Sequence, residues 1–235
     1  MRTTEQIEKI KNRVIDPYVV KDFLTYSEIE NLVRVFDDNN EQKIHKNTGP
    51  VTLNIHPFLH YPIFQTVLKK IENEIGKFRL MTAFFFTVKN PHIIHNDDLF
   101  ELPDDSYRAI TIPLTLNGRV TSVKYPRLCM FDQFYFHGPA KFFNKSENLS
   151  TWYNKQVYEY SQVDGLVDTP VVDENKYLTH LKPEWLEGLS LHSTLEWKPT
   201  NALIFDSLRL HCASDFRQIG IQEKLGLSIF TLKEH

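Results

Sequence analysis

The sequence has few cysteines, no long apolar run and almost no net charge. Its two cysteines, Cys129 and Cys212, are too few and too isolated to suggest a disulfide framework or a zinc site. The longest apolar stretch, residues 80–88, is too short to cross a bilayer, and the polar N-terminus lacks the apolar core of a signal peptide. We therefore expect a cytoplasmic protein that has no membrane partner.

An excess of charge of either sign is also missing. The chain has 27 Lys and Arg residues against 30 Asp and Glu residues, which gives a formal net charge of −3 at pH 7. A chain balanced in this way has no overall field that attracts nucleic acid, so we expect no nucleic-acid partner. The sequence makes no prediction about the oligomeric state.

Nothing in the sequence marks a domain boundary. The chain has no internal repeat, low-complexity tract or Gly/Ser linker, so we expect a single domain over residues 1–235. A hydrophobic content of 41% is enough to bury a core. An aromatic content of 13% exceeds what a core of this size needs, and we expect some of these rings to line a pocket.

Two helices are predicted in the first third of the chain. An extended segment over residues 14–24 leads into Thr25 and Glu28, which have capping-box spacing, and apolar residues then recur at helical intervals. A second helix is predicted over residues 61–77, where one apolar stripe ends at Gly76, a typical helix stop.

Strand patterns dominate the rest of the chain. The predicted strands span residues 79–88, 107–116, 120–125, 128–136, 189–197, 202–205 and 225–232. Pro113 marks the second of them as an edge strand or an irregular one. Short helices are predicted within 152–160 and 174–186. Helices followed by many short strands predict a mainly β barrel or sandwich with helical buttressing.

Three residues have the pattern of a metal site. His95 and Asp97 follow a predicted strand in PHIIHNDD, and in an extended backbone both side chains point to one side. A lone His-x-Asp pair recurs by chance, but His211, in NALIFDSLRLHCASDF, offers a second imidazole from a neighbouring strand. A metal ion held by two imidazoles and one carboxylate keeps three coordination positions open, as a non-haem Fe(II) oxygenase requires. A structural zinc site, by contrast, takes four protein ligands. Asp98 is the alternative carboxylate, and the two-residue spacing favours Asp97.

A basic residue opens the last predicted strand, in EKLGLSIFTL. Lys224 can pair as a point charge with the far carboxylate of a dicarboxylic cosubstrate, although it lacks the two-pronged geometry of arginine. Arg217 and Arg108 are the alternatives for this role. A solvated charge at the end of a strand is the ordinary fate of a lysine, and that interpretation stays open for Lys224.

The order His-x-Asp, a long interval, His and then a basic strand start resembles the 2-oxoglutarate- and Fe(II)-dependent oxygenase superfamily. The opening VIDPYVVKDFLTYSEIENLV resembles the entry of its prolyl-hydroxylase-like branch. The resemblance implies a double-stranded β-helix, the cupin-like jelly roll. It also implies that His95, Asp97 and His211 bind Fe(II) and that Lys224 anchors 2-oxoglutarate. The implied reaction consumes O₂, releases succinate and CO₂, and hydroxylates or otherwise oxidises an unidentified small molecule or protein side chain.

Two features depart from the family pattern. Arginine is more frequent than lysine at the anchor, and the interval between Asp97 and His211 is longer than a minimal barrel needs. We therefore predict that much of residues 126–199 is an insertion specific to a subgroup. Two other functions remain open: a cupin-like metalloenzyme that uses no keto acid, and a non-catalytic jelly-roll binding module. The sequence also does not distinguish Fe(II) from Mn(II) or Ni(II) as the metal of the purified protein.

Overall fold

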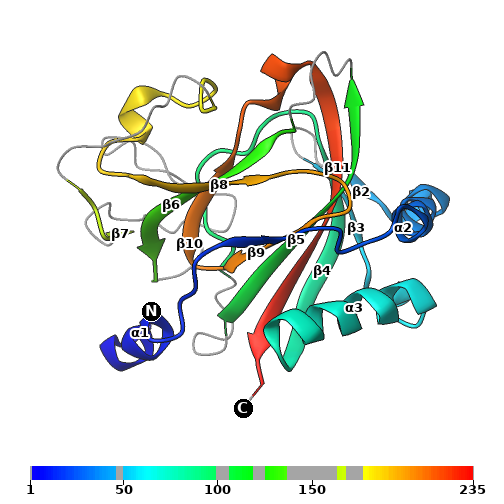
Figure 1. Cartoon of the computed structure of the whole chain (residues 1–235), viewed down its shortest axis with the longest axis horizontal. Coiled ribbons are helices and arrows are strands. Elements are labelled where there is room, and N and C mark those ends of the chain that lie inside the picture. Colours follow the sequence, from blue (N-terminus) through cyan, green and yellow to red (C-terminus); the bar gives the residue numbers. More distant parts are fainter. Residues whose placement is uncertain are drawn as a thin grey trace.

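The computed structural model describes residues 2–45, 50–98, 106–118, 125–136, 163–167 and 177–234 (Figure 1). The helices are α1 (Thr4–Lys11), α2 (Tyr26–Asp38) and α3 (Pro62–Ile75), with short 3-10 turns η1 (Asn40–Gln42), η2 (His56–Phe58), η5 (Pro183–Trp185) and η6 (Phe216–Ile219). The strands are β1 (Tyr18–Val20), β2 (Ile44–His45), β3 (Val51–Asn54), β4 (Phe78–Val88), β5 (Ser106–Gly118), β6 (Arg127–Tyr135), β7 (Val163–Asp164), β8 (Leu191–Glu196), β9 (Ala202–Asp206), β10 (Arg209–Ala213) and β11 (Ile221–Lys233). No helix in these ranges is long and apolar enough to span a membrane.

The strands form two antiparallel sheets. The large sheet has the order β1-β9-β5-β11-β4-β3-β2, and the second has β10-β6-β7 with β8 paired to β6. One apolar cluster contains side chains of both sheets, among them Met130 of β6 and Phe205 of β9, so the sheets pack face to face. This mainly β sandwich with helices confirms the architecture that the sequence predicted.

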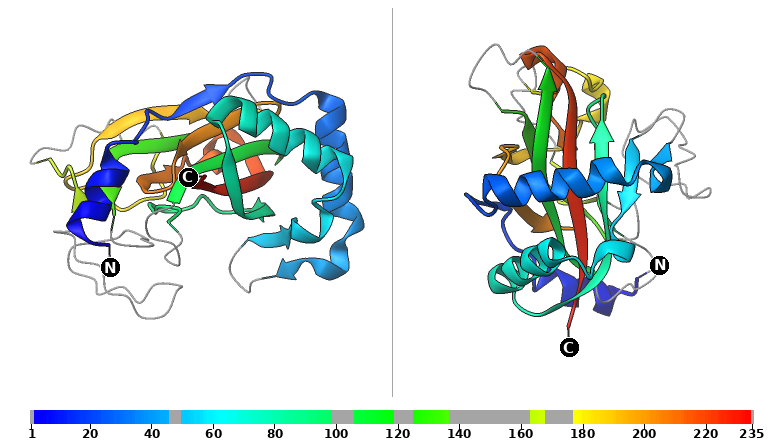
Figure 2. Two further views of the ribbon diagram at one scale, coloured as in Figure 1. Left: turned by 90° about the horizontal axis from the view of Figure 1, so that it is seen from below. Right: turned by 90° about the vertical axis from the view of Figure 1, so that its right-hand side faces the viewer.

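The large sheet presents different residues on its two faces. Along β11, Leu225, Leu227 and Ile229 point outwards and pack with α2 and α3. These helices lie across the same face of the sheet in Figure 2. The residues between them point into the space between the two sheets, because successive strand residues alternate sides. Lys224 is therefore on the interior face, together with Phe230.

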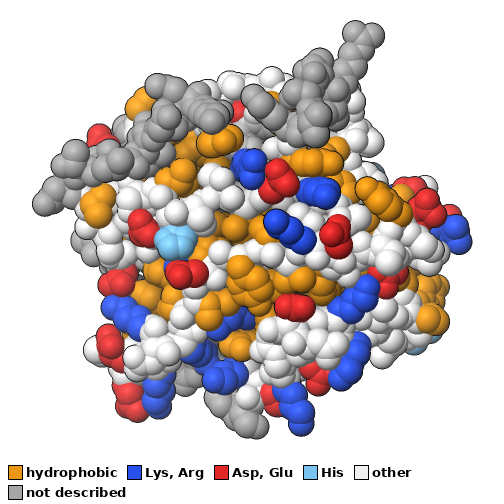
Figure 3. All heavy atoms as spheres, in the orientation of Figure 1, with side chains coloured by type: hydrophobic (Ala, Val, Ile, Leu, Met, Phe, Trp, Pro, Cys, Tyr) orange, Lys and Arg blue, Asp and Glu red, His pale blue; other side chains and the backbone are white. Residues whose placement is uncertain are grey.

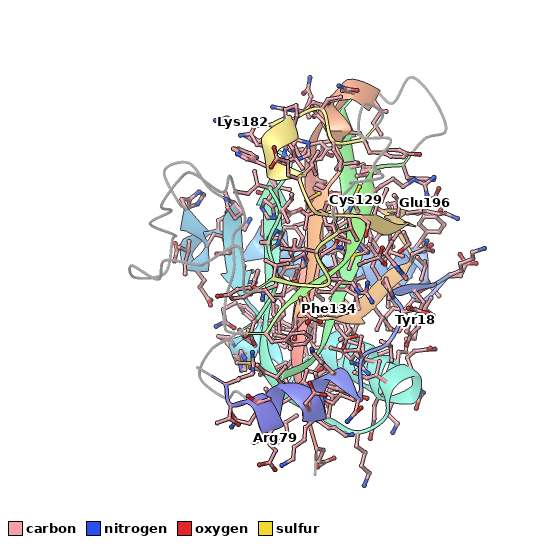
Figure 4. All side chains as sticks on the ribbon, turned by 90° about the vertical axis from the view of Figure 1, so that its left-hand side faces the viewer. Tyr18, Arg79, Cys129, Phe134, Lys182 and Glu196 are labelled. Atoms are coloured by element: carbon pink, nitrogen blue, oxygen red, sulfur yellow. The ribbon has the colours of Figure 1, made fainter. Side chains whose placement is uncertain are left out.

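The second sheet is covered on its far side by the segment that contains η5. Cys129 and Phe131 of β6 pack there with Leu181 and Leu189. Figure 4 looks at this side of the molecule, with Cys129 and Phe134 labelled on β6 and Lys182 on the covering segment. The intervening β6 residues, such as Met130, face the large sheet.

The N-terminal region differs from its prediction. Residues 14–24, expected to be extended, contain only the short strand β1, and a helix, α1, precedes it. α1 begins with a capping box between Thr3 and Gln6, but it buries only Ile10, so its sequence has no apolar stripe to reveal it. α2 and α3 lie where periodicity predicted them, and Gly76 ends α3 with a positive φ of 78°.

Of the two alternatives predicted for the strand that contains Pro113, the structure has the irregular strand. β5 lies between β9 and β11 and is not an edge strand, and the register against β11 shifts beside Pro113. One helix prediction needs correction. The described part of 174–186 forms turns and η5 rather than a longer helix. The predictions for 120–125 and 152–160 fall almost entirely outside the described residues.

The predicted insertion contains part of the sandwich. Residues 126–199 include β6, β7 and β8, which belong to the second sheet, while other parts of this range lie outside the described residues. The single domain over 1–235 and a subgroup-specific insertion elsewhere in this range stay predictions.

Thr25 is expected to stabilise the protein through the start of α2. Its hydroxyl accepts a hydrogen bond from the Glu28 N–H, and the Glu28 carboxylate accepts one from the Thr25 N–H at 2.7 Å. Thr25→Ala removes this cap and should lower the free energy of unfolding by about 1 kcal/mol in urea titrations. Thr66→Ala, at an exposed interior position of α3, is the control and should change it by less than about 0.5 kcal/mol. Equal losses in the two variants would contradict the role of the cap.

Candidate functional site

Three of the predicted site residues meet where the segment after β4 runs beside β10. His95 and His211 form an isolated antiparallel bridge, in which each backbone N–H donates to the other residue's carbonyl oxygen at 2.9 and 2.8 Å. The Asp97 N–H donates to the carbonyl oxygen of Ser207 at 2.7 Å, just before β10. These backbone bonds bring together segments that lie far apart in the sequence.

The side chains of these three residues converge on one point. Each of His95, Asp97 and His211 offers a ligand atom, and these atoms all lie within 4.8 Å of one another. Nε2 of His95 lies 3.7 Å from one carboxylate oxygen of Asp97, and Nε2 of His211 lies 3.3 Å from the other. Two imidazoles and one carboxylate can hold a divalent metal ion in this arrangement.

The other ring nitrogens set the orientation of both histidines. Nδ1 of His95 lies 2.7 Å from the carbonyl oxygen of Ile93, and Nδ1 of His211 lies 2.9 Å from that of Arg209. A carbonyl oxygen only accepts, so Nδ1 donates in each ring, and Nε2 is the ring atom directed at Asp97. Metal-binding histidines are commonly held by such an outer hydrogen bond.

Burial and the neighbouring rings act in opposite directions on Asp97. Burial raises the pKa of its carboxyl, but His211, His95 and His92 lower it, and the net effect is a pKa below the ordinary value. The carboxyl is therefore ionised at neutral pH. On the interior side, the Phe205 ring packs edge-on to His211 with centroids 4.8 Å apart.

The second carboxylate of the motif faces away from the histidines. The buried side chain of Asp98 accepts two hydrogen bonds from the guanidinium of Arg2. Asp97, and not Asp98, is therefore the carboxylate beside the two histidines.

Lys224 lies in the interior near the start of β11, and only 3% of its surface is exposed. Its ammonium nitrogen lies 3.8 Å from the centre of the Trp197 ring and 5.2 Å from that of Phe216. Burial lowers its pKa to about 7, and among the described residues Cys129 and Cys212 act in the opposite direction. No carboxylate of the described residues pairs with it, so an anionic ligand would stabilise its charged form.

Aromatic rings connect the surroundings of Lys224 with the three converging residues. Trp197 packs edge-on against Phe86, with ring centroids 5.9 Å apart. Phe86 stacks on His92 at 6.5 Å, and His92 lies edge-on to His95 at 5.7 Å. Lys224 and His95 therefore lie at opposite ends of a continuous row of rings between the sheets, formed by Trp197, Phe86 and His92, which we call the aromatic wall.

A glycine makes room for this wall. Gly226 lies two residues after Lys224 on the same face of β11, and its position is in contact with two of the rings. A Cβ atom there would lie 2.8 Å from Cζ2 of Trp197 and 2.9 Å from Cζ of Phe86, too close for van der Waals contact. The absence of a side chain lets the Trp197 ring lie close to the strand beside the lysine.

The two alternative basic residues are both paired with carboxylates. Arg108 is buried and forms an ion pair with Asp206 on the neighbouring strand β9. Arg217 lies in η6 and donates to both oxygens of Asp215 at 2.9 and 3.2 Å, which raises the pKa of the guanidinium. Both guanidinium groups therefore already have anionic partners within the protein.

Sequence reasoning missed two of the residues around this site. Trp197 stands at the end of a predicted strand and belongs to no motif, so only the fold shows that it covers the lysine. Arg2 lies in a polar segment, where a lone arginine is ordinarily solvated. Neither position carries a local signal in the sequence.

Comparison with solved structures identifies the fold, whereas no family model and no curated protein matches the sequence. The non-haem α-ketoglutarate-dependent epimerase SnoN from nogalamycin biosynthesis matches 97% of this chain and 83% of its own, with a TM-score of 0.52 and 13% identity. The carbocyclase SnoK from the same biosynthesis matches 99% and 84%, with a TM-score of 0.50 and 10% identity. The chain thus has the fold of enzymes that use α-ketoglutarate, which is 2-oxoglutarate, and the predicted double-stranded β-helix is confirmed.

A prolyl-4-hydroxylase from Pseudomonas putida also aligns, over 98% of both chains, with a TM-score of 0.48 and 10% identity. A likeness at this level does not assign the chain to a branch of the superfamily. The prolyl-hydroxylase-like branch therefore stays a prediction, and no relative's substrate is carried over to this chain.

Gly226→Ala should displace the Trp197 ring from its place beside Lys224. The added methyl group overlaps the ring, so we expect a loss of about 1–3 kcal/mol in stability and a changed tryptophan signal in near-UV circular dichroism. Ser228→Ala, at the next position on the same face, adds no atom and should keep the wild-type spectrum. A Gly226→Ala protein with wild-type stability and spectrum would show that the ring does not lie against this glycine.

Proposed function

We propose that this protein is an Fe(II)- and 2-oxoglutarate-dependent oxygenase in which His95, Asp97 and His211 hold the iron. The observation that supports this most directly is the convergence of two imidazole Nε2 atoms and one carboxylate on a single point. The fold shared with α-ketoglutarate-dependent enzymes supports the same proposal.

The donor set fits Fe(II) better than a structural metal. Three ligands leave coordination positions open for a keto acid and O₂, whereas a structural zinc site is closed by four. Asp97 supplies the single negative charge, so a bound divalent ion keeps a net positive charge that attracts an anionic cosubstrate. When bound, the iron supplies the O₂ chemistry that side chains cannot perform.

Hydrogen bonds of Nδ1 orient the two histidines of the triad for metal binding. Because Nδ1 donates to a backbone carbonyl oxygen in both His95 and His211, Nε2 is the atom that each ring directs towards Asp97 and the metal position. Their hydrogen bonds also prevent ring rotation, so the donors are oriented before the metal arrives. Phe205 and the aromatic wall keep water from the interior side of the site.

We propose that Lys224 anchors the far carboxylate of 2-oxoglutarate. Its ammonium is buried between Trp197 and Phe216 and meets no carboxylate of the described residues. A carboxylate arriving there gains a charge-assisted hydrogen bond in an apolar setting, where such a bond is strong. Arg108 and Arg217 are less suited to the role, since each is already paired.

The substrate that is oxidised is proposed only by class, as a small molecule or a protein side chain. On the face shown in Figure 3, basic and acidic side chains are interspersed, which is consistent with the expected lack of a nucleic-acid partner. We also propose that the protein works in the cytoplasm, where its two buried cysteines stay thiols.

The first test is anaerobic titration of the Fe(II)-loaded protein with 2-oxoglutarate. We expect the weak visible charge-transfer band of a chelated keto acid, and we expect His95→Ala and His211→Ala to abolish Fe(II) binding. His192→Ala is the control, because this partly exposed histidine contacts Asp132, away from the triad. Iron binding that survives in both triad variants would contradict the assignment.

The same titration separates the proposal from its rivals. Bound iron without the band, and no succinate in the presence of O₂, would favour a cupin-like metalloenzyme that uses no keto acid. A protein that binds metal but consumes no 2-oxoglutarate with any substrate tried would favour a binding module.

The affinity for 2-oxoglutarate should fall with rising pH above about 7. The pKa of Lys224 in the free protein is about 7, and the dicarboxylate binds the protonated form. Affinity should therefore be nearly constant below pH 7 and fall roughly tenfold for each pH unit above it. Anaerobic titrations between pH 6 and 9 measure this. Lys224→Ala should weaken 2-oxoglutarate binding at every pH while Fe(II) binding is unchanged.

Two variants identify the group that titrates. Lys224→Arg keeps a charge that does not titrate in this range, so the pH dependence should flatten in the cosubstrate binding that remains. His180 is another titratable group that interacts with Lys224, and burial lowers its pKa. His180→Asn should keep the wild-type slope. A pH dependence of the affinity that is unchanged in Lys224→Arg, or lost in His180→Asn, would show that a group other than Lys224 titrates.

A further inference from the structure

Side chains of the His-x-Asp segment alternate between two directions. His95 and Asp97 face the point that they share with His211, whereas Asn96 and Asp98 are buried away from it. The Asn96 amide donates to a backbone carbonyl oxygen at the end of β6, at 3.1 Å. The residues beside the proposed ligands therefore attach this segment to the second sheet.

Arg2 makes the corresponding attachment for Asp98. Its guanidinium donates to the two carboxylate oxygens at 2.6 and 2.8 Å and to the carbonyl oxygen of Phe136 at 2.7 Å. Only 3% of the Arg2 side chain and none of the Asp98 side chain is exposed. A buried, two-pronged pair of this kind fixes the direction of the carboxylate.

The helix that follows Arg2 is held by contacts of its own. Ile10 of α1 packs in a small apolar cluster with Phe136 and Leu208, close to the ends of β6 and β10 (Figure 1). Lys11 forms an ion pair with Asp164 of β7 at 3.0 Å. Removing the guanidinium of Arg2 alone therefore leaves most of the docking of α1 in place.

We propose that Arg2 is a positioning residue for the metal site, acting through Asp98. By holding Asp98 away from the histidines, it leaves Asp97 as the one carboxylate that reaches the ion. The inference rests on the proposed function, since it assumes that the triad binds metal.

The physical reason is competition between two adjacent carboxylates. Without the guanidinium of Arg2, the buried carboxylate of Asp98 loses a partner of opposite charge, and a divalent ion bound by the adjacent residue Asp97 attracts it. Turning Asp98 towards that ion twists the backbone of Asp97 and adds a second anionic ligand. The metal then has a different donor set and fewer open positions.

Co(II) binding to the full chain tests the proposal, because its visible d–d spectrum reports the donor set. The metal-free wild type, Arg2→Ala and Arg2→Lys proteins are titrated with Co(II), and the thermal unfolding of each is recorded before metal is added. We expect Arg2→Ala to bind Co(II) with a shifted spectrum, because a second carboxylate enters the donor set. Arg2→Lys keeps the charge and should keep the wild-type band positions.

Two further variants separate positioning from a general loss of stability. Lys11→Ala removes an ion pair of α1 that does not touch Asp98, and it should keep wild-type affinity and spectrum. Asp98→Asn in the Arg2→Ala background removes the competing carboxylate and should restore the wild-type spectrum. A double variant that keeps the shifted spectrum of Arg2→Ala would overturn the proposal, as would an Arg2→Ala protein with wild-type affinity and spectrum. If Arg2→Ala does not fold, Arg2→Gln, which keeps a long polar side chain without the charge, replaces it. A shifted spectrum in Arg2→Gln that Asp98→Asn restores supports the proposal, and a wild-type spectrum in Arg2→Gln overturns it.

Failure of this inference is distinguishable from failure of the proposed function. A wild-type protein that binds no Co(II), or whose His211→Ala variant binds it equally well, would overturn the metal site and the role of Arg2 with it. Wild-type binding that depends on His211 but not on Arg2 would overturn the role of Arg2 alone.

Discussion

Two backbone hydrogen bonds between His95 and His211 join the segment after β4 to strand β10. Because the two residues stand directly opposite each other in an antiparallel pair, their side chains emerge on the same side. Asp97, two residues further along an extended backbone, points to that side as well. A shift of the pairing by one residue would send one histidine to the opposite face, so the proposed metal site depends on this register.

Buried charges in the described part of this protein differ in the partners that they have. Arg108 with Asp206, and Arg2 with Asp98, are pairs in which each charge compensates the other away from water. Lys224 is as deeply buried, yet aromatic rings surround its ammonium, and its pKa is lowered to about 7. Burying a charge without a partner costs free energy, and proteins keep such a group mainly where a ligand pairs with it. The surroundings of Lys224 therefore support an anchoring role.

Local patterns predicted the elements whose periodicity is strong. Apolar stripes located α2 and α3, the capping box of Thr25 and Glu28 located a helix start, and alternation located most strands of both sheets. A failure occurred where the local pattern is weak, because α1 buries only Ile10. For the strand that contains Pro113 the sequence left an edge position and an irregularity open, and the register shift against β11 shows that the second applies.

Local patterns were sufficient to predict a mainly β fold and to nominate His95, Asp97, His211 and Lys224, because strand alternation, a two-residue spacing and a strand start are local properties. Which of these side chains meet depends on the pairing of distant segments, and long-range packing sets that pairing. The tertiary structure also decided that Asp98 turns to Arg2, and it placed the ring of Trp197 over the lysine. Such partners come from separate elements, and no short-range pattern in a single sequence encodes them.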